Sequence, residues 1–81
     1  MDLKDRIAIV TGGSRGIGKK IVEVFCNRGA KVYFTYNSNH DEAEKTVQSS
    51  GAVAIQCNQN DHEGINRVVD SIFDKEKRIN I

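Results

Sequence analysis

The sequence contains no tryptophan, and its aromatic residues are few. Three phenylalanines and two tyrosines stand within a hydrophobic fraction of 38%. A core must therefore be built mainly from isoleucine, valine and alanine side chains. With 81 residues, the chain can form one small domain at most, because short chains bury a smaller share of their surface than long chains do.

Several functional classes lack their usual sequence signals. Twelve Lys and Arg against eleven Asp and Glu leave a formal charge of +1, so the basic excess typical of nucleic-acid binders is missing. No apolar run approaches the ~20 residues that cross a bilayer, and the opening MDLKDR lacks the apolar centre of a secretory signal. We expect a cytoplasmic protein with neither nucleic acid nor membrane as partner.

The two cysteines, Cys26 and Cys57, are far apart in the sequence and in apolar surroundings. They form neither a CxxC pair nor a cluster with histidine, which are the usual signals of a redox or metal site. We expect two buried small hydrophobic residues, with no disulfide and no metal.

The first third of the chain predicts a strand, a glycine turn and a helix. Residues 7–10, IAIV, form a short β-branched run typical of a strand that is buried on both faces. From Ile17 to Asn27 apolar residues recur at helical spacing, and Gly29 marks the end of that helix.

The rest of the chain repeats this alternation. Residues 31–36 predict a second strand, and Asn37, Ser38 and Asn39 supply turn and N-cap chemistry for a helix over about residues 40–49. Residues 52–57 predict a third strand. Asn60 and Glu63 resemble a capping box in front of an amphipathic helix. Residues 79–81 resemble the opening of a fourth strand.

This alternation predicts an α/β fold with a Rossmann-type parallel sheet flanked by helices. We expect about three strands and three helices in one unit that covers residues 1–81. The carboxyl end of the first strand then carries the glycine turn.

The glycine turn, TGGSRGIG at residues 11–18, favours a bound anion. Glycines at a strand-to-helix turn allow a tight bend and leave the helix N-terminus open to a pyrophosphate. The spacing differs from the common G-x-G-x-x-G fingerprint of dinucleotide sites. A Walker-type loop is excluded because Lys19, Lys20 and Ile21 follow Gly18, so no Gly-Lys-Ser/Thr is present.

The pattern T-G-x-x-x-G-x-G, with Ile17 between its last two glycines, resembles the signature of the short-chain dehydrogenase/reductase family. The resemblance extends over the whole chain. Residues 13–18 are most similar to the bacterial 3-oxoacyl-[acyl-carrier-protein] reductases. The resemblance implies an oxidoreductase that reduces a carbonyl with a nicotinamide cofactor.

The cofactor predicted from these residues is NADP rather than NAD. An NAD site normally has an acidic residue about 20 positions past the glycines, at the end of the second strand. Here that window holds Tyr36, Asn37 and Ser38, none of which would repel a 2′-phosphate. The resemblance also implies that Arg15 contacts the adenosine-side phosphate.

After the third strand, the residue that matches the family's adenine-binding Asp is Asn58. Its amide can still accept a hydrogen bond from the adenine amino group. The predicted cofactor-binding residues are Thr11, Gly12, Ser14, Arg15, Gly16, Ile17, Gly18, Tyr36, Asn37, Ser38 and Asn58. For His40 and His62 the sequence identifies no partner, and we expect a structural or solvent role for each.

No catalytic residue is predicted. The resemblance implies an Asn-Asn-Ala-Gly segment, a catalytic Ser and Tyr-x-x-x-Lys further along than residue 81. Within the chain, Asn37 follows Tyr33 by four residues and His40 follows Tyr36 by four. We therefore expect a C-terminal truncation that is inactive by itself.

In the strand order 3-2-1-4 the missing fourth strand leaves the first strand as a sheet edge. This edge predicts pairing with a complementary chain or self-association. Three functions remain open: the cofactor-binding part of an NADP-dependent reductase, a non-catalytic nucleotide-binding or interaction fragment, and an inert gene remnant.

Overall fold

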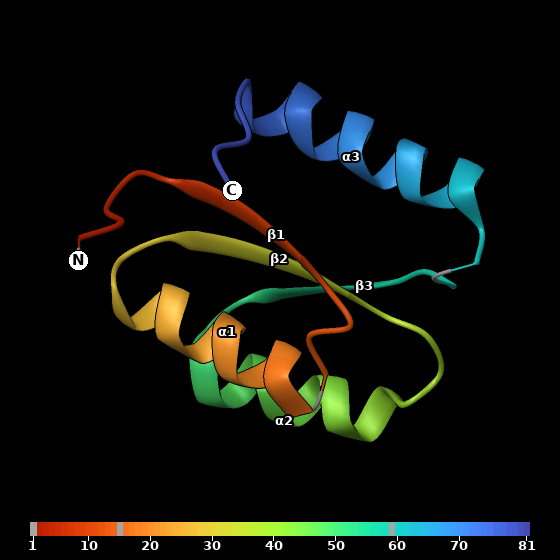
Figure 1. Cartoon of the computed structure of the whole chain (residues 1–81), viewed down its shortest axis with the longest axis horizontal. Coiled ribbons are helices and arrows are strands. Elements are labelled where there is room, and N and C mark those ends of the chain that lie inside the picture. The colour runs from red at the N-terminus through yellow and green to blue at the C-terminus, as the bar shows by residue number, and fades with distance from the viewer. Residues whose placement is uncertain (1, 15, 59) are drawn as a thin grey trace.

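The computed structural model describes residues 2–14, 16–58 and 60–81, and strands and helices alternate along them (Figure 1). The elements are β1 (Ile7–Thr11), α1 (Gly16–Asn27), β2 (Lys31–Tyr36), α2 (His40–Ser50), β3 (Val53–Gln56) and α3 (His62–Glu76). The predicted alternation is confirmed, and so are the predicted bounds of β2. Among the described residues, no helix is both long and apolar enough to cross a membrane.

The strands form a parallel sheet in the order β1-β2-β3, with β2 in the centre. Val10 pairs with Phe34, and Phe34 pairs with Ala54. Helices α1 and α2 cover one face of this sheet, and α3 lies on the opposite face (Figure 1). The predicted Rossmann-type α/β fold is therefore confirmed. Because all strands run in one direction, their carboxyl ends meet at one edge of the sheet.

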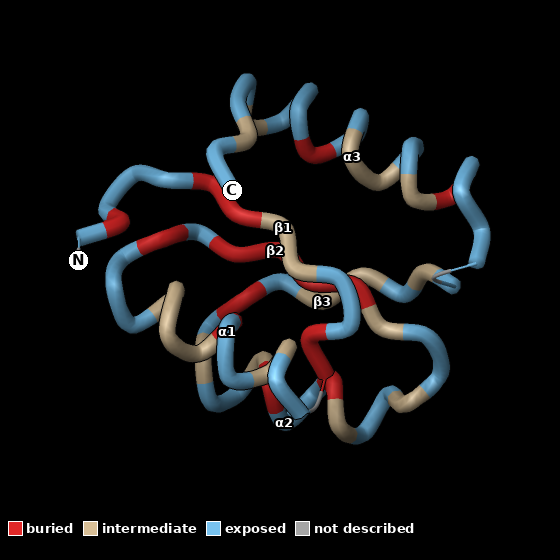
Figure 2. Tube along the Cα trace, in the orientation of Figure 1, coloured by how far each residue is buried: buried red, intermediate tan, exposed pale blue. Residues whose placement is uncertain are grey.

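The larger core lies between the sheet and the two helices α1 and α2. Ala8, Val22, Val32, Phe34 and Ala43 are each at most 2% exposed there. Successive residues of a strand point to opposite faces, so Val32 and Phe34 enter this core while Tyr33 faces α3. Figure 2 shows a long buried stretch in β2 and a shorter one at the start of β1.

The second face of the sheet holds a smaller cluster under α3. It contains Ile7, Tyr33 and Ile72. Near the C-terminal end of α3, the Glu76 carboxylate lies 2.6 Å from the Lys31 ammonium and accepts a hydrogen bond from the Tyr33 hydroxyl. This polar contact and the small cluster together hold α3 against the sheet.

Two local predictions need correction. The N-cap of α3 is Asp61 rather than Asn60: the Asp61 carboxylate accepts the Gly64 N–H at 2.9 Å. A carboxylate at this position also interacts favourably with the helix dipole. The strand β1 is not buried on both faces along its length, because Ile9 and Val10 are only half-buried and Thr11 is exposed. The reason is that β2 pairs with β1 on one side only.

The last residues of the chain lie along the outer edge of β1 (Figure 1). The Ile81 N–H donates to the Ile7 carbonyl at 3.2 Å, and the Ile9 N–H donates to the Ile81 carbonyl at 3.2 Å. This is the hydrogen-bond pattern of a parallel strand pair. In addition, the Asn80 side-chain oxygen accepts the Ile7 N–H at 2.9 Å. Residues 79–81 therefore lie where the sequence predicts the opening of a fourth strand.

Candidate functional site

The glycine turn connects the carboxyl end of β1 to the N-terminus of α1. Gly12 and Gly16 have φ angles of +71° and +65°, in the left-handed region that glycine adopts at little cost. The N–H groups of Gly12 and Gly13 both donate to the Thr35 carbonyl, at 3.0 and 3.1 Å. The turn is thus fixed to the carboxyl end of the neighbouring strand β2.

Two other glycines are required by close approach. A Cβ on Gly18 would lie 2.2 Å from the Gly12 carbonyl oxygen, so any side chain would push α1 away from the turn. A Cβ on Gly13 would lie 2.6 Å from the Cβ of Phe34. The family pattern treats position 13 as variable, so its packing requirement could not be inferred from the spacing.

Helix α2 holds the turn from the side. The Thr46 hydroxyl lies 3.1 Å from the Ser14 carbonyl and 3.1 Å from the Glu42 carbonyl, and its one proton is shared between them. Thr46 is fully buried and Ser14 is 8% exposed. Sequence reasoning missed Thr46. The available signal was its position three residues after Ala43, which places it on the thin apolar face of the helix.

A polar hollow of about 370 Å³ opens at the carboxyl ends of the strands. Its lining residues are Gly12, Ser14, Thr35, Tyr36, Asn37, Ser38, Asn39 and Cys57. Five of these, Gly12, Ser14, Tyr36, Asn37 and Ser38, were predicted as cofactor-binding residues. No lining residue is acidic, and the hydroxyl, amide and backbone groups suit an anionic sugar-phosphate ligand.

The other predicted residues that the structure describes are not in the lining of this hollow. Thr11 and Gly16 are exposed parts of the turn, and Gly18 packs against it. Ile17, the second residue of α1, is 81% exposed. Arg15 lies outside the described residues.

Asn58 is exposed just after β3, next to Cys57, which lines the hollow. The Asn58 side-chain oxygen accepts the Asn60 N–H at 2.9 Å, which shapes the loop before α3. An amide oxygen has two lone pairs. Asn58 thus retains the capacity to accept a second hydrogen bond.

A second feature that sequence reasoning missed is a ring pair at the end of β2. The Tyr36 hydroxyl lies 3.0 Å from Nδ1 of His40, and the two rings meet edge to face at 5.2 Å. The sequence identified no partner for His40, and we expected a structural or solvent role. The structure shows Tyr36 beside it. Tyr36 lines the hollow, so His40 is one contact away from it.

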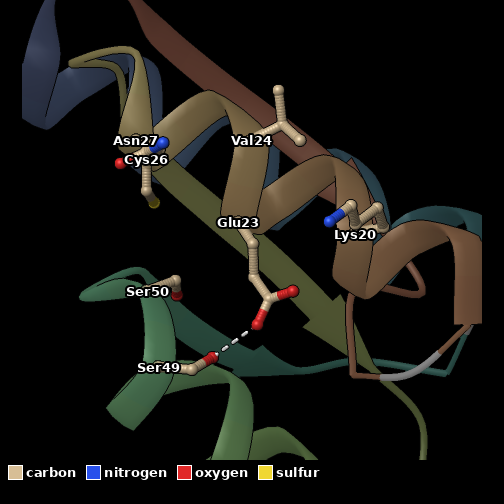
Figure 3. Close-up of a pocket in the computed structure, with 7 residues that line it drawn as sticks. All are labelled: Lys20, Glu23, Val24, Cys26, Asn27, Ser49 and Ser50. Carbon is tan, nitrogen blue, oxygen red and sulfur yellow. Dashed lines mark hydrogen bonds between the residues drawn. The ribbon is translucent and has the colours of Figure 1, made fainter.

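A separate hollow of about 350 Å³ lies between α1 and α2 (Figure 3). Glu23 reaches from α1 to Ser49 on α2, whose hydroxyl donates to it at 2.8 Å. Cys26 lines the same hollow; burial raises the pKa of its thiol, and a hydrogen bond with Ser50 opposes that shift. Both cysteines are free and half-buried. This hollow contains none of the predicted binding residues and lies away from the strand ends.

Comparisons with known proteins agree with this geometry. Residues 6–81 match the family described as short chain dehydrogenase. The chain is 42% identical to the short-chain dehydrogenase/reductase FrzI of Cladobotryum sp, over 98% of this chain and 33% of that protein.

Solved structures show the same likeness. A short chain dehydrogenase from Burkholderia cenocepacia in complex with NADP aligns with a TM-score of 0.91 at 30% identity, over 99% of this chain and 35% of that one. BdcA of E. coli, in complex with NADPH, aligns with a TM-score of 0.84 at 36% identity, over 86% and 29% of the two chains. The chain thus spans about a third of the length of the relatives it matches.

Proposed function

Because the chain belongs to the short-chain dehydrogenase family, we propose that it binds NADP at the carboxyl ends of β1 and β2. In this role it supplies the cofactor-binding part of an NADP-dependent carbonyl reductase. The observation that carries the proposal is the hollow that joins the glycine turn to Tyr36, Asn37 and Ser38 without an acidic lining residue. When bound, the cofactor's nicotinamide supplies the hydride for reduction.

The chain's own residues fit the parts of this cofactor. The first turn of α1, which begins at Gly16, offers N–H groups and the positive end of a helix dipole to the pyrophosphate. Asn37 and Ser38 offer donors to a 2′-phosphate. By the family resemblance, Asn58 would accept a hydrogen bond from the adenine amino group, and Arg15 would contact the phosphate on the adenosine side.

One substitution that introduces a carboxylate into the hollow tests the preference for NADP over NAD. In titration calorimetry of the whole chain, NADP should bind more tightly than NAD. Asn37→Asp should weaken NADP binding by about 10- to 100-fold, because a hydrogen bond to a charged group is worth roughly 1.5–3 kcal/mol. NAD binding should change little or improve. Binding of both cofactors with equal affinity by the unaltered chain would contradict the preference.

A charge reversal tests the second determinant of this preference. Arg15→Glu should weaken NADP binding far more than NAD binding, because only NADP carries the 2′-phosphate on the adenosine. The measurement is the same pair of titrations, with Lys45→Glu as a matched reversal on α2. Equal losses for NADP and NAD would show that Arg15 does not contribute to the selectivity.

For the reaction itself, we propose that a 3-oxoacyl thioester is the substrate class and that further polypeptide must supply the acid/base tyrosine. The chain has no Tyr-x-x-x-Lys, so it cannot protonate the substrate oxygen in the family's manner. The 81-residue chain, mixed with NADPH and an acetoacetyl thioester, should leave the nicotinamide absorbance unchanged. Oxidation of NADPH would contradict this division of roles.

A second candidate function is an interaction through the outer edge of β1. Residues 79–81 pair with only the first part of that strand, and the edge beyond Ile9 has no strand partner among the described residues. We propose that this edge accepts a strand that runs parallel to β1 from a complementary chain, with pairing to a second copy as the alternative. An inert remnant would bind neither NADP nor a partner, and calorimetry distinguishes that case.

A further inference from the structure

The ring pair Tyr36–His40 brackets the loop that faces the proposed 2′-phosphate. Tyr36 is the last residue of β2 and lines the polar hollow, and His40 is the first residue of α2. Between them, Asn37, Ser38 and Asn39 line the same hollow. An adjoining hollow of about 400 Å³ is lined by Ser38, Asn39, His40 and Asp41. The tyrosine and the histidine thus stand at the two ends of the loop, and their rings meet beside it.

The contact between the rings depends on the protonation state of His40. The Tyr36 hydroxyl lies 3.0 Å from Nδ1 of His40. A neutral imidazole has one donor nitrogen and one acceptor nitrogen, so the tyrosine can donate its single proton to Nδ1. A protonated imidazole donates from both nitrogens, and the tyrosine oxygen must then accept. Protonation thus releases the tyrosine proton for another acceptor and adds a positive charge beside the loop.

The acidic side chains around His40 could compete with a bound phosphate for the charge of a protonated imidazole, and most of them have other partners. On α2 the nearest acids are Asp41, Glu42 and Glu44, of which Glu42 pairs with Lys45 at 3.3 Å and Glu44 accepts from Gln48 at 3.3 Å. Asp41, the neighbour of His40, is exposed.

The elements next to α2 add no acid near His40. The first turn of α1 contains no acidic residue, and β3, VAIQ, contains no charged residue. From β2 the group that faces His40 is Tyr36, and the loop of residues 37–39 is uncharged. Asp41 is therefore the acid next to His40 in the sequence, and its side chain forms no ion pair with the described residues.

We propose that His40, acting through Tyr36, makes the preference for a ribose 2′-phosphate over a free 2′-hydroxyl depend on pH, with NADP favoured more strongly when His40 is protonated. This inference rests on the proposed binding of NADP. His40 is a positioning residue, since it acts through the tyrosine that lines the hollow. Histidine is the side chain type that ordinarily changes its charge between about pH 5 and pH 8, so the test is made in that range.

The test compares NADP and NAD affinities of the whole chain by calorimetry at about pH 8 and about pH 6, on either side of the ordinary histidine pKa. The ratio of the two dissociation constants should shift toward NADP by about three- to fivefold on acidification, the size expected of a partly exposed charge contact. His40→Gln should remove this shift. Tyr36→Phe should reduce it, because the charge remains while the released donor is lost.

His62→Gln is the matched control. His62 is the other histidine of the chain and opens α3 on the opposite face of the sheet. The 2′-phosphate itself gains a proton near pH 6, at about the pKa of a phosphate monoester, and this opposing effect is the same in every variant. The His62→Gln chain should therefore behave like the unaltered chain.

The outcomes separate the inference from the proposed function. If NADP binds more tightly than NAD but the ratio changes with pH by the same factor in the unaltered chain and in His40→Gln, the inference is wrong and the proposed function stands. If a folded chain binds NADP at neither pH, both are wrong. As a second readout, adding NADP should perturb the imidazole NMR signals of His40 but not those of His62.

Discussion

The two faces of the sheet are stabilised in different ways. On the α1/α2 face, Phe34, Val22, Val32 and Thr46 are each less than 2% exposed. On the α3 face, the buried cluster consists of Ile7, Tyr33 and Ile72, and the Phe73 side chain of α3 is 52% exposed. The glycine turn contacts the first face, through Phe34 and Thr46. The candidate site therefore depends on the better packed face, and α3 depends on a smaller cluster and a polar contact.

The largest expected effect comes from a matched pair of phenylalanines. Phe34→Ala should lower the free energy of unfolding by about 3–5 kcal/mol, because it leaves a cavity under the glycine turn. That loss is comparable with the whole stability of a small domain. Phe73→Ala should cost less than about 1 kcal/mol, because its side chain is half exposed. Urea denaturation followed by circular dichroism measures both, and equal losses would contradict the difference between the faces.

The next effect concerns the close approach at Gly18. Gly18→Ala places a Cβ 2.2 Å from the Gly12 carbonyl, so the turn or α1 must shift. Overpacking of this kind costs about 1–3 kcal/mol, and we expect at least a tenfold loss of NADP affinity. Lys20→Ala, at an exposed position of the same helix, is the control and should bind NADP normally. Normal binding by Gly18→Ala would show that the turn does not need this approach.

A smaller effect is expected at Thr46. Thr46→Val keeps the shape of the side chain but removes the hydroxyl that donates toward the Ser14 carbonyl. The loss of a buried hydrogen bond should cost about 1–2 kcal/mol of stability. It should also weaken NADP binding, because the glycine turn loses its hydrogen bond to α2. Thr46→Ser keeps the hydroxyl and should retain NADP affinity, whereas equal NADP affinity in both variants would deny Thr46 a role in the site.

The smallest expected effect is a pH dependence limited to the α3 face. Hydrogen bonds from Lys31 and then Tyr33 lower the pKa of the Glu76 carboxyl. Its contribution is therefore complete above the ordinary glutamate pKa and is lost as the pH falls through the lowered pKa. The hydrogen bond to Glu76 raises the pKa of Lys31, so the lysine contribution is complete below its ordinary pKa and is lost as the pH rises through the raised value.

Amide hydrogen exchange can localise this effect. On acidification, the amides of α3 should lose protection before those of α1 do. Glu76→Gln should lower the protection of α3 at neutral pH and remove its dependence on acid, and Glu63→Gln, in the first turn of the same helix, is the control. A uniform loss of protection over both helices would show that the Lys31–Glu76 contact does not act locally.

Much of the fold followed from local patterns. The alternation of apolar runs and helical spacing predicted all six elements, and the bounds of β2 agree with the structure. The errors came where neighbours compete. Asp61, not Asn60, caps α3 because the two polar residues are adjacent and only the backbone geometry selects between them. The run IAIV was interpreted as a strand buried on both faces, but β1 lies at the edge of the sheet, where Ile9 and Val10 are only half-buried.

The site was predicted only in part, because local spacing shows the turn but not the long-range contacts that hold it. Glycine spacing and the lack of an acid after β2 indicated a phosphate-binding turn, and five of the predicted residues line one hollow. Gly13 and Thr46 were missed, since their importance lies in contacts with Phe34 and Ser14 that are distant in sequence. His40 was assigned no partner, although Tyr36 precedes it by only four residues.

The sequence alone determined the family, the parallel α/β arrangement and the positions of the glycines, because each depends on the order and spacing of neighbouring residues. Only the tertiary structure decided which side chains hold the glycine turn, how α3 is attached and which tyrosine meets His40. Those contacts join separate elements, and their distances are set by how the two faces of the sheet pack. The hollow at the strand ends depends on local spacing and on long-range packing. The spacing of the glycines forms the turn, and contacts with Thr35, Phe34 and Thr46 hold the turn in position.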